Sequence, residues 1–216
     1  FTRSYFHYLG GGTQADQNVI ENGAVNYDQT IIARIALAKG ITTILDTYVL
    51  YMKTRYDINN PVFNANHAYY NNEYMPVDYG PYRLVRIGGR DEPGWWNSWD
   101  WTLDTGAAAC LIMTSLDAYS RTGNADYREL ASLFGGYILQ LQDSDGGIRY
   151  GPRGMYHANG PDFFWNLKST EQNERAACAL KNLAFVTGKT EFSLASDSIT
   201  AWLKSMYDTS VHLFHS

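Results

Sequence analysis

Hydrophobic residues recur at helical spacing in three separate parts of the chain. In the first part, a helix is expected to begin at Asn26, which can cap it together with Gln29, and to stop at Gly40. A second helix is expected over about 42–56, where apolar residues again lie three and four positions apart. The pattern therefore predicts an antiparallel helical hairpin over about 26–56.

Two further hairpins repeat one another at a constant offset of 65 residues. The segments 105–143 and 170–208 align without a gap, and the Thr-Gly pair at 122–123 falls on the pair at 187–188. A constant offset across two helices is the signature of a repeated helix–turn–helix unit, and the glycine suits the residue after a helix. We expect the alanine-rich first helices to form an inner ring and to run in one direction. Their N-terminal ends would then meet at a single rim, and the second helices would form an outer ring.

The remaining segments are rich in glycine, asparagine and aromatic residues. We expect residues 1–25 to form an extended arm and 26–216 to form one domain. The stretch 57–103 is interpreted as an irregular insertion, and a loop of that length in a compact domain is usually functional. Within it, residues 81–88 can form a short strand, as part of a hairpin or at an edge. The stretch 148–169 is a second long aromatic loop, expected to lie beside the end of the first.

Composition narrows the classes of partner. The hydrophobic content of 45% fits a globular protein, and the net charge of −5 without any basic cluster argues against a nucleic-acid partner. The sequence has no apolar run long enough to predict a membrane span. Cys110 and Cys178 both lie in alanine-rich helical sequence, which favours free thiols over a disulfide. The chain begins at Phe1 without a signal peptide, so we interpret it as processed there or as a piece of a longer protein.

Tryptophans and carboxylates gather just before the second hairpin. Four of the six tryptophans lie within residues 91–104, which also hold four acidic residues. The apolar face of a sugar ring stacks on an indole ring while carboxylates bind its hydroxyl groups, so a carbohydrate site is one interpretation. The other is an aromatic loop that packs over helix ends and shields a core. The four tryptophans are Trp95, Trp96, Trp99 and Trp101.

Several short segments, in this order, resemble α/α-toroid proteins of the six-hairpin glycosidase-like superfamily. The resemblance is carried by residues 27–29, 104–111, 141–147 and 169–173, together with the Thr-Gly pairs that end the first helices. It spans roughly 26–210 and implies an all-α fold, a barrel of helical hairpins. The residue pattern adds the long aromatic loops and the short strand within 81–88, as part of a small β-hairpin or at an edge. The resemblance also implies a substrate cleft at one end of the barrel, often for polysaccharides. A complete barrel needs about twice this length, so the chain is a fragment, a partner completes the ring, or the toroid is open.

Three acidic residues lie at the starts of the first helices: Asp28, Asp104 and Glu171. Under the glycosidase interpretation two of them form the acid and base pair, held about 6.5–9.5 Å apart if the enzyme inverts configuration. The alternative is that they cap helices, because the helix dipole and free N–H groups favour acids there. Asp104 suits such a cap. Ser169 and Gln172 suit a capping box, which would leave the Glu171 carboxylate free for catalysis.

The remaining candidate residues either belong to the same predicted site or are not expected to form a site. Trp165, Tyr27 and His157 are candidate substrate contacts alongside the four clustered tryptophans. The segment 143–147 resembles the opening of a calcium loop, but the acidic twelfth position is missing, which favours a turn after a helix. The histidines are scattered, so no metal site is expected, and no nucleotide-binding or nucleophile-elbow motif is present. We expect no cofactor.

Two functions follow from these patterns. The first is an extracellular or cell-envelope glycoside hydrolase that cleaves a polysaccharide with paired carboxylates. The second is a non-catalytic surface-layer or filament subunit, in which a homo-oligomer completes the open ring. Three hairpins favour the second function, because half a barrel exposes an apolar flank that something must cover.

Overall fold

The chain folds mainly into helices in the part that the computed structural model describes, residues 23–42, 46, 49, 84–86, 104–151, 162–211, 213 and 214. Two short strand pairs accompany them. The helices are α2 (Asn26–Ala38), α5 (Thr105–Thr122), α6 (Ala125–Gln140), α7 (Thr170–Thr187) and α8 (Thr190–Ser205). The strands are β1 (Gly23–Val25), β2 (Leu84–Arg86), β3 (Tyr207–Asp208) and β4 (Leu213–Phe214). The predicted all-α class is confirmed at this level.

The 65-residue repeat is reproduced residue for residue. Both α5 and α7 contain 18 residues, both α6 and α8 contain 16, and each boundary in the first hairpin lies 65 positions before its counterpart. Gly123 and Gly188 end the first helices with φ of 70° and 71°, a left-handed conformation that a side chain would strain. The predicted helix–turn–helix unit and its glycine stop are therefore confirmed.

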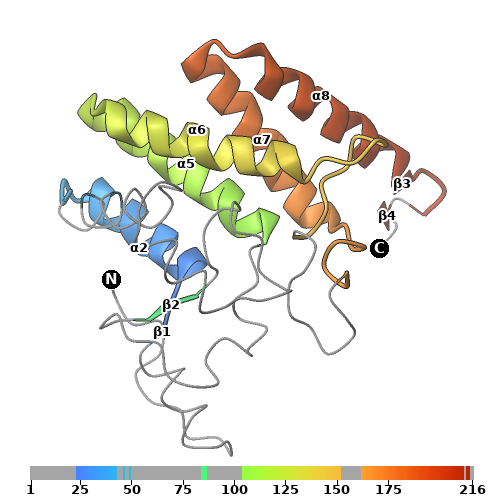
Figure 1. Cartoon of the computed structure of the whole chain (residues 1–216), viewed down its shortest axis with the longest axis horizontal. Helices are drawn as coiled ribbons and strands as arrows, with labels where there is room; N and C mark the ends of the chain where they lie inside the picture. The colour runs from blue at the N-terminus through green and yellow to red at the C-terminus, as the bar shows by residue number, and fades with distance from the viewer. Residues whose placement is uncertain are drawn as a thin grey trace, which may run out of the picture.

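The first helices lie side by side in one row. Helix α5 lies between α2 and α7 and packs against both, while α6 packs on α5 and α8 packs on α7. Figure 1 shows α2, α5 and α7 running in the same direction, with their N-terminal ends on the side of the molecule that carries β1 and β2. The expected common orientation of the first helices is therefore confirmed for this row.

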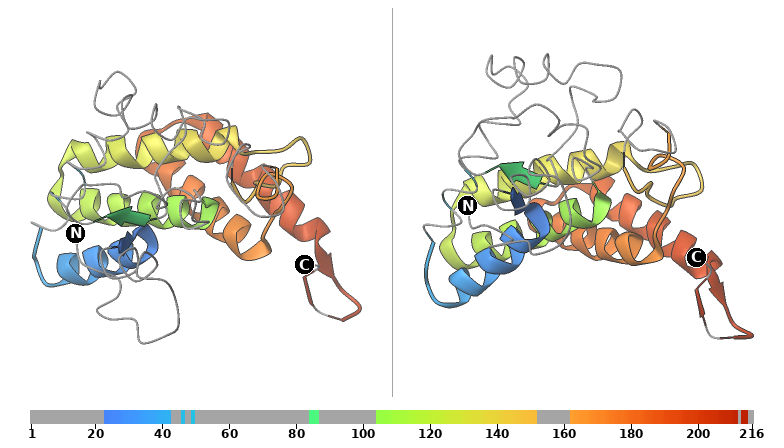
Figure 2. Two further views of the ribbon diagram at one scale, coloured as in Figure 1. Left: turned by 60° about the horizontal axis from the view of Figure 1, so that its bottom comes forward. Right: turned by 90° about the horizontal axis from the view of Figure 1, so that it is seen from below.

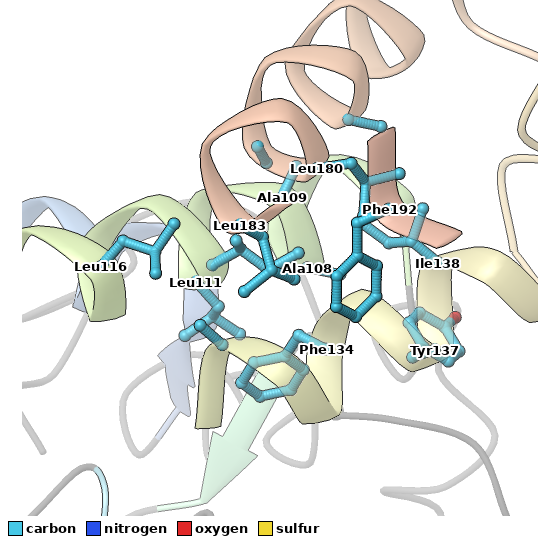
Figure 3. Close-up of a cluster of buried hydrophobic side chains, with 14 of the residues drawn as sticks. Ala108, Ala109, Leu111, Leu116, Phe134, Tyr137, Ile138, Leu180, Leu183 and Phe192 are labelled. Atoms are coloured by element: carbon cyan, nitrogen blue, oxygen red, sulfur yellow. The ribbon is translucent and has the colours of Figure 1, made fainter. Parts of the chain in front are cut away.

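Small residues let the helices of the row approach closely, and large ones fill the space beneath the second helices. Ala108 and Ala109 on α5 and Ala176 on α7 are fully buried. Figure 3 shows side chains from four helices meeting in this core. Besides Ala108 and Ala109, its labelled members are Leu111 and Leu116 of α5, Phe134, Tyr137 and Ile138 of α6, Leu180 and Leu183 of α7, and Phe192 of α8.

Contacts between residues that are distant in sequence give the predicted N-terminal arm a strand. Gly23–Val25 was expected to belong to an arm without its own element, but it forms β1 and pairs antiparallel with β2. The predicted strand within 81–88 is confirmed, and its partner lies about sixty residues earlier rather than in a local hairpin. Helix α2 is confirmed, and Asp46 and Val49 of the expected second helix are helical. The rest of 42–56, and most of the insertion 57–103, lie outside the described residues.

The C-terminal strands were not expected from the sequence. β3 and β4 pair antiparallel and form a small ribbon that leaves the end of α8 (Figure 2). Within the described ranges, no helix is both long enough and apolar enough to cross a bilayer.

Candidate functional site

The N-terminal ends of α5 and α7 are both capped by the residues expected to cap them. The Asp104 carboxylate accepts a hydrogen bond from the Ala107 N–H at 2.7 Å, and the Ser169 hydroxyl accepts one from the Gln172 N–H at 3.3 Å. These bonds satisfy donors that the first helical turn leaves free. Both predicted caps are confirmed, and they lie at equivalent positions of the repeat.

The reciprocal half of the predicted capping box is not formed. A box would need the Gln172 side chain to accept from the Ser169 N–H, yet Gln172 Oε1 is buried and has no hydrogen-bond partner. The Gln172 side chain packs instead against the first turn of α5. A Cβ atom added to Gly106 would lie 3.0 Å from Gln172 Cγ and 3.2 Å from Asp104 Oδ1. Gly106 therefore allows an amide from α7 and a carboxylate from α5 to share one small space.

Glu171 is exposed, and the prediction that its carboxylate is free is wrong. Arg175, one turn further along α7, donates to Glu171 Oε1 at 2.6 Å. The same guanidinium approaches Cys110 Sγ on α5 at 3.9 Å. Burial raises the pKa of the Cys110 thiol, and the positive charge of Arg175 opposes that rise. Arg175 thus contacts the first turn of its own helix α7 and the second turn of α5.

Asp28 lies in the first turn of α2 and is partly buried. Its helix begins on the same side of the molecule as α5 and α7 (Figure 1). Within the described residues, no hydrogen bond joins Asp28, Asp104 and Glu171 to one another. Asp28, Asp104 and Glu171 therefore each lie at the start of a helix of the row, and among the described residues Asp104 shares its space at Gly106 with Gln172.

The loop after α6 is held against the start of α5 by backbone and side-chain bonds. The Thr105 N–H donates to the Tyr150 carbonyl at 3.0 Å, and the Thr105 hydroxyl donates to the Arg149 carbonyl at 2.7 Å. Tyr150 stacks on Phe164 with ring centroids 5.3 Å apart. The described parts of the predicted second aromatic loop, 148–151 and 162–169, are therefore held at the start of α5.

Asn173, which was not among the predicted site residues, fixes this loop to α7. Its amide donates to the Ile148 carbonyl at 2.9 Å, and its carbonyl accepts from the Ile148 N–H at 2.6 Å. The residue is fully buried, and the repeat has Ala108 at the equivalent position. A polar residue in an otherwise alanine-lined buried stripe was the signal that could have identified it.

Charged side chains bind the two ends of the loop together. Lys168 donates to Asp143 Oδ2 at 2.7 Å and to Asp145 Oδ1 at 2.7 Å, and Arg149 donates to the same Asp143 oxygen at 2.7 Å. The hydrogen bond from Lys168, followed by that from the Ser144 N–H, lowers the pKa of Asp143 to about 2. The segment 143–147 is confirmed as a turn after a helix. The Asp143 and Asp145 carboxylates bind positively charged side chains of the same chain, Lys168 and Arg149.

Trp165 is the one predicted sugar platform that the structure describes in full. The Arg149 guanidinium lies 4.3 Å from the Trp165 ring centroid, and Arg149 also donates to the Trp165 carbonyl at 2.7 Å. One face of this indole therefore already carries a cation, and a sugar would have to use another part of the ring.

The other predicted contacts lie outside the described residues. They are Trp95, Trp96, Trp99, Trp101 and His157, together with the side chain of Tyr27. In the part of the chain that is described, no group of three or more His, Cys, Asp or Glu residues is arranged to hold a metal ion.

Comparison with known proteins gives a relation in structure and not in sequence. No protein-family model and no curated protein matches the sequence. A solved structure described as a novel alpha-amylase from Clostridium perfringens is similar, with a TM-score of 0.54 and 12% identity over 90% of this chain. This chain spans 46% of that one, which is therefore about twice as long. At this identity the likeness is one of fold: the helical arrangement described above is similar to part of a protein named for a carbohydrate-degrading activity.

Proposed function

We propose that the chain is a carbohydrate-active protein, a glycoside hydrolase whose helical row forms part of an α/α toroid. The observation that supports the proposal is the common direction of α2, α5 and α7 (Figure 1), since Asp28, Asp104 and Glu171 belong to the starts of these three helices. Paired carboxylates at such an end suit general acid and base catalysis at a glycosidic bond. The likeness to a structure named as an alpha-amylase supports the same class of substrate.

Within this proposal, Asp104 and Glu171 are the leading pair and Asp28 is the alternative member. Asp104 lies beside Gln172, and Glu171 is accessible at the neighbouring helix end. The aromatic loop that holds Tyr150 and Trp165 is tied to the start of α5, and so would line one side of the substrate. Trp95, Trp96, Trp99 and Trp101 precede α5 directly in sequence, and His157 and Tyr27 complete the proposed contacts. An extracellular or cell-envelope location is part of the proposal.

The test is reducing-end release from a panel of polysaccharides that includes starch, comparing wild type with Asp104→Asn and Glu171→Gln. Asparagine is as good an N-cap as aspartate, so Asp104→Asn keeps the helix cap while it removes the titratable carboxyl group. We expect turnover to fall by about 10²–10⁴ in the variant that loses the acid or base, with little change in melting temperature. Ser169→Ala is the matched control, because it removes the equivalent cap of α7 without removing a carboxylate.

The possible outcomes distinguish a wrong choice of catalytic residues from the absence of hydrolase activity. Unchanged turnover in both carboxylate variants contradicts the assigned pair, and the same comparison with Asp28→Asn then tests the third acid. If Ser169→Ala loses as much turnover as Asp104→Asn, the loss comes from a disturbed helix start and not from a missing catalytic carboxyl group. A wild-type protein without activity on any glycan contradicts the hydrolase proposal.

A non-catalytic surface-layer or filament subunit is the second candidate function. It is favoured by the structural roles that both leading carboxylates already have, since Asp104 caps α5 and Glu171 is bound by Arg175. Under this candidate the helical fold is used as a building block, and the glycine-rich residues 1–25 would bind a neighbouring copy. A soluble, active enzyme of fixed size argues against it, whereas an inactive protein that forms open polymers supports it.

A further inference from the structure

The side chain of Gln172 on α7 carries a buried oxygen that accepts no hydrogen bond. Among the described residues, Gln172 Oε1 is the one buried side-chain nitrogen or oxygen atom without a partner. Leaving a buried acceptor without a donor costs free energy, so such an atom calls for a physical explanation. The missing partner is an O–H or N–H group that another state of the site can supply.

Asp104, the cap of α5, lies beside the Gln172 amide. Gln172 Cδ and Asp104 Oδ1 lie 3.3 and 3.2 Å from the point that a Cβ atom of Gly106 would occupy. Gly106 is the repeat equivalent of Glu171, so α5 has no side chain where α7 carries a carboxylate. The space left by Gly106 holds the amide and the carboxyl group together. A carboxyl group becomes an O–H donor when it is protonated, so Asp104 can supply the missing donor.

Charged groups of three helices lie near the start of α5. Burial raises the pKa of the Cys110 thiol on α5, Arg175 lowers it, Asp104 raises it further and Arg34 lowers it. The charges of α2 and α7 therefore act at the same place as the charge of Asp104. The titratable or charged groups described at these helix starts and in the adjoining loop are Asp28 and Arg34 of α2, Cys110 of α5, Glu171 and Arg175 of α7, and Arg149.

The two cations and the capping bond favour a carboxylate at Asp104, and the Gln172 oxygen opposes them. Arg34 and Arg175 act through their charge, and the Ala107 N–H donates to Asp104 Oδ1 at 2.7 Å. An oxygen acceptor, in contrast, can bind a carboxyl group only through its proton. A neutral Asp104 can keep Oδ1 as the acceptor of the cap and carry the proton on Oδ2. Capping of α5 and donation to Gln172 are therefore compatible.

We propose that Gln172 is a positioning residue for Asp104: its buried oxygen accepts the proton of the neutral carboxyl group, which makes Asp104 the general acid. The inference rests on the proposed hydrolase function and assigns a role within its carboxylate pair. When substrate binds, the glycosidic oxygen replaces Gln172 as the acceptor. The Asp104 proton passes to that oxygen as its bond to the anomeric carbon breaks, and the bonding pair stays on the oxygen. Water attacks the anomeric carbon and gives a proton to Glu171.

The first experiment follows the Asp104 carboxyl carbon by NMR as the pH is varied, with Asp104→Asn to assign the signal. Gln172→Met keeps an unbranched side chain and removes the acceptor. We expect it to move the Asp104 titration to lower pH by about one pH unit, which is about tenfold in proton affinity. Asn182→Met is the matched control, because Asn182 is exposed further along α7 and its amide donates to the Cys178 carbonyl.

The direction of the shift separates the proposed role from the alternatives. An amide that only packs against Asp104, or that donates to its carboxylate, gives a shift to higher pH when a thioether replaces it. A titration of Asp104 that stays in place or moves to higher pH in Gln172→Met therefore overturns the proposal. So does an equal shift in Asn182→Met.

The second experiment measures kcat/KM against pH on a polysaccharide that wild type hydrolyses. The alkaline limb reports the acid of the free enzyme, so Gln172→Met should move it to lower pH by about one pH unit and leave the acid limb in place. An active Gln172→Met with an unmoved alkaline limb overturns the role of Gln172 and leaves the hydrolase function standing. A wild type without activity on any glycan removes that function and the acid role with it, and the NMR titration still decides whether Gln172 accepts from Asp104.

Discussion

Gly135 and Gly136 are adjacent on α6 and have opposite surroundings. A Cβ atom at Gly135 would lie 2.4 Å from Leu183 Cδ2 and 2.8 Å from Phe192 Cε1, whereas one at Gly136 would meet nothing within 4 Å. We expect Gly135→Ala to lower the free energy of unfolding by about 1–3 kcal/mol, because two buried side chains must move. Gly136→Ala should raise it by about 0.5–1 kcal/mol through helix propensity. Urea denaturation of both variants measures the difference, and similar effects of the two would contradict the close packing of α6 on α7.

At the scale of elements, Asp143 joins the loop after α6 to the start of α7 and should make stability depend on pH. Its pKa is lowered to about 2, mainly by Lys168, so its contribution is present above about pH 4 and is lost as pH falls toward 2. The side chain is 26% exposed, which reduces the effect through solvent screening. We expect Asp143→Asn to lower the free energy of unfolding at pH 7 by about 1–2 kcal/mol.

The difference between wild type and Asp143→Asn should shrink as the pH is lowered to 2, and denaturation at several pH values measures it. Asp197→Asn is the control, because Asp197 and its partner Lys181 form an exposed ion pair. Exposed pairs contribute about 0–1 kcal/mol, so this variant should differ little from wild type. A difference for Asp143→Asn that stays constant down to pH 2 would show that the carboxylate charge is not what fixes the loop.

At the scale of the whole molecule, one side-chain bond couples the first hairpin to the repeat. The Tyr127 hydroxyl on α6 donates to Asp46, and Tyr127 is buried. Burial, and then this hydrogen bond, raise the pKa of Tyr127 well above its usual range. Above about pH 10 the unfolded chain loses this proton while the folded chain keeps it, so the stabilisation declines as pH rises.

Tyr127→Phe introduces the residue that the second repeat has at the equivalent position, Phe192. We expect it to lower the free energy of unfolding by about 0.5–1.5 kcal/mol at pH 7, since Asp46 is exposed and regains water. The difference in stability between the variant and wild type should disappear above pH 10, and thermal denaturation across that pH range measures it. A gap that widens with rising pH would contradict the role of the neutral hydroxyl.

Part of the candidate site could be predicted from sequence because it depends on neighbours three or four residues apart. The caps at Asp104 and Ser169 follow from their positions just before helical stripes. The Glu171–Arg175 ion pair was missed although its spacing of four residues is visible in the sequence. Gln172 was assigned a local partner, yet its side chain packs against Gly106 on another helix, which no local pattern indicates.

The sequence by itself determined the four helices of the repeat, their boundaries and the caps at Asp104 and Ser169, because a repeat with one offset and a glycine stop fixes local backbone geometry. It also determined the helical class and the pairing of helices within each hairpin, since short turns leave antiparallel packing as the available arrangement. Only the tertiary structure decided which side chains meet across the row: Arg175 with Cys110, Asn173 with Ile148, and β1 with β2. Those contacts join residues tens of positions apart, and their partners are selected by how whole helices pack against one another.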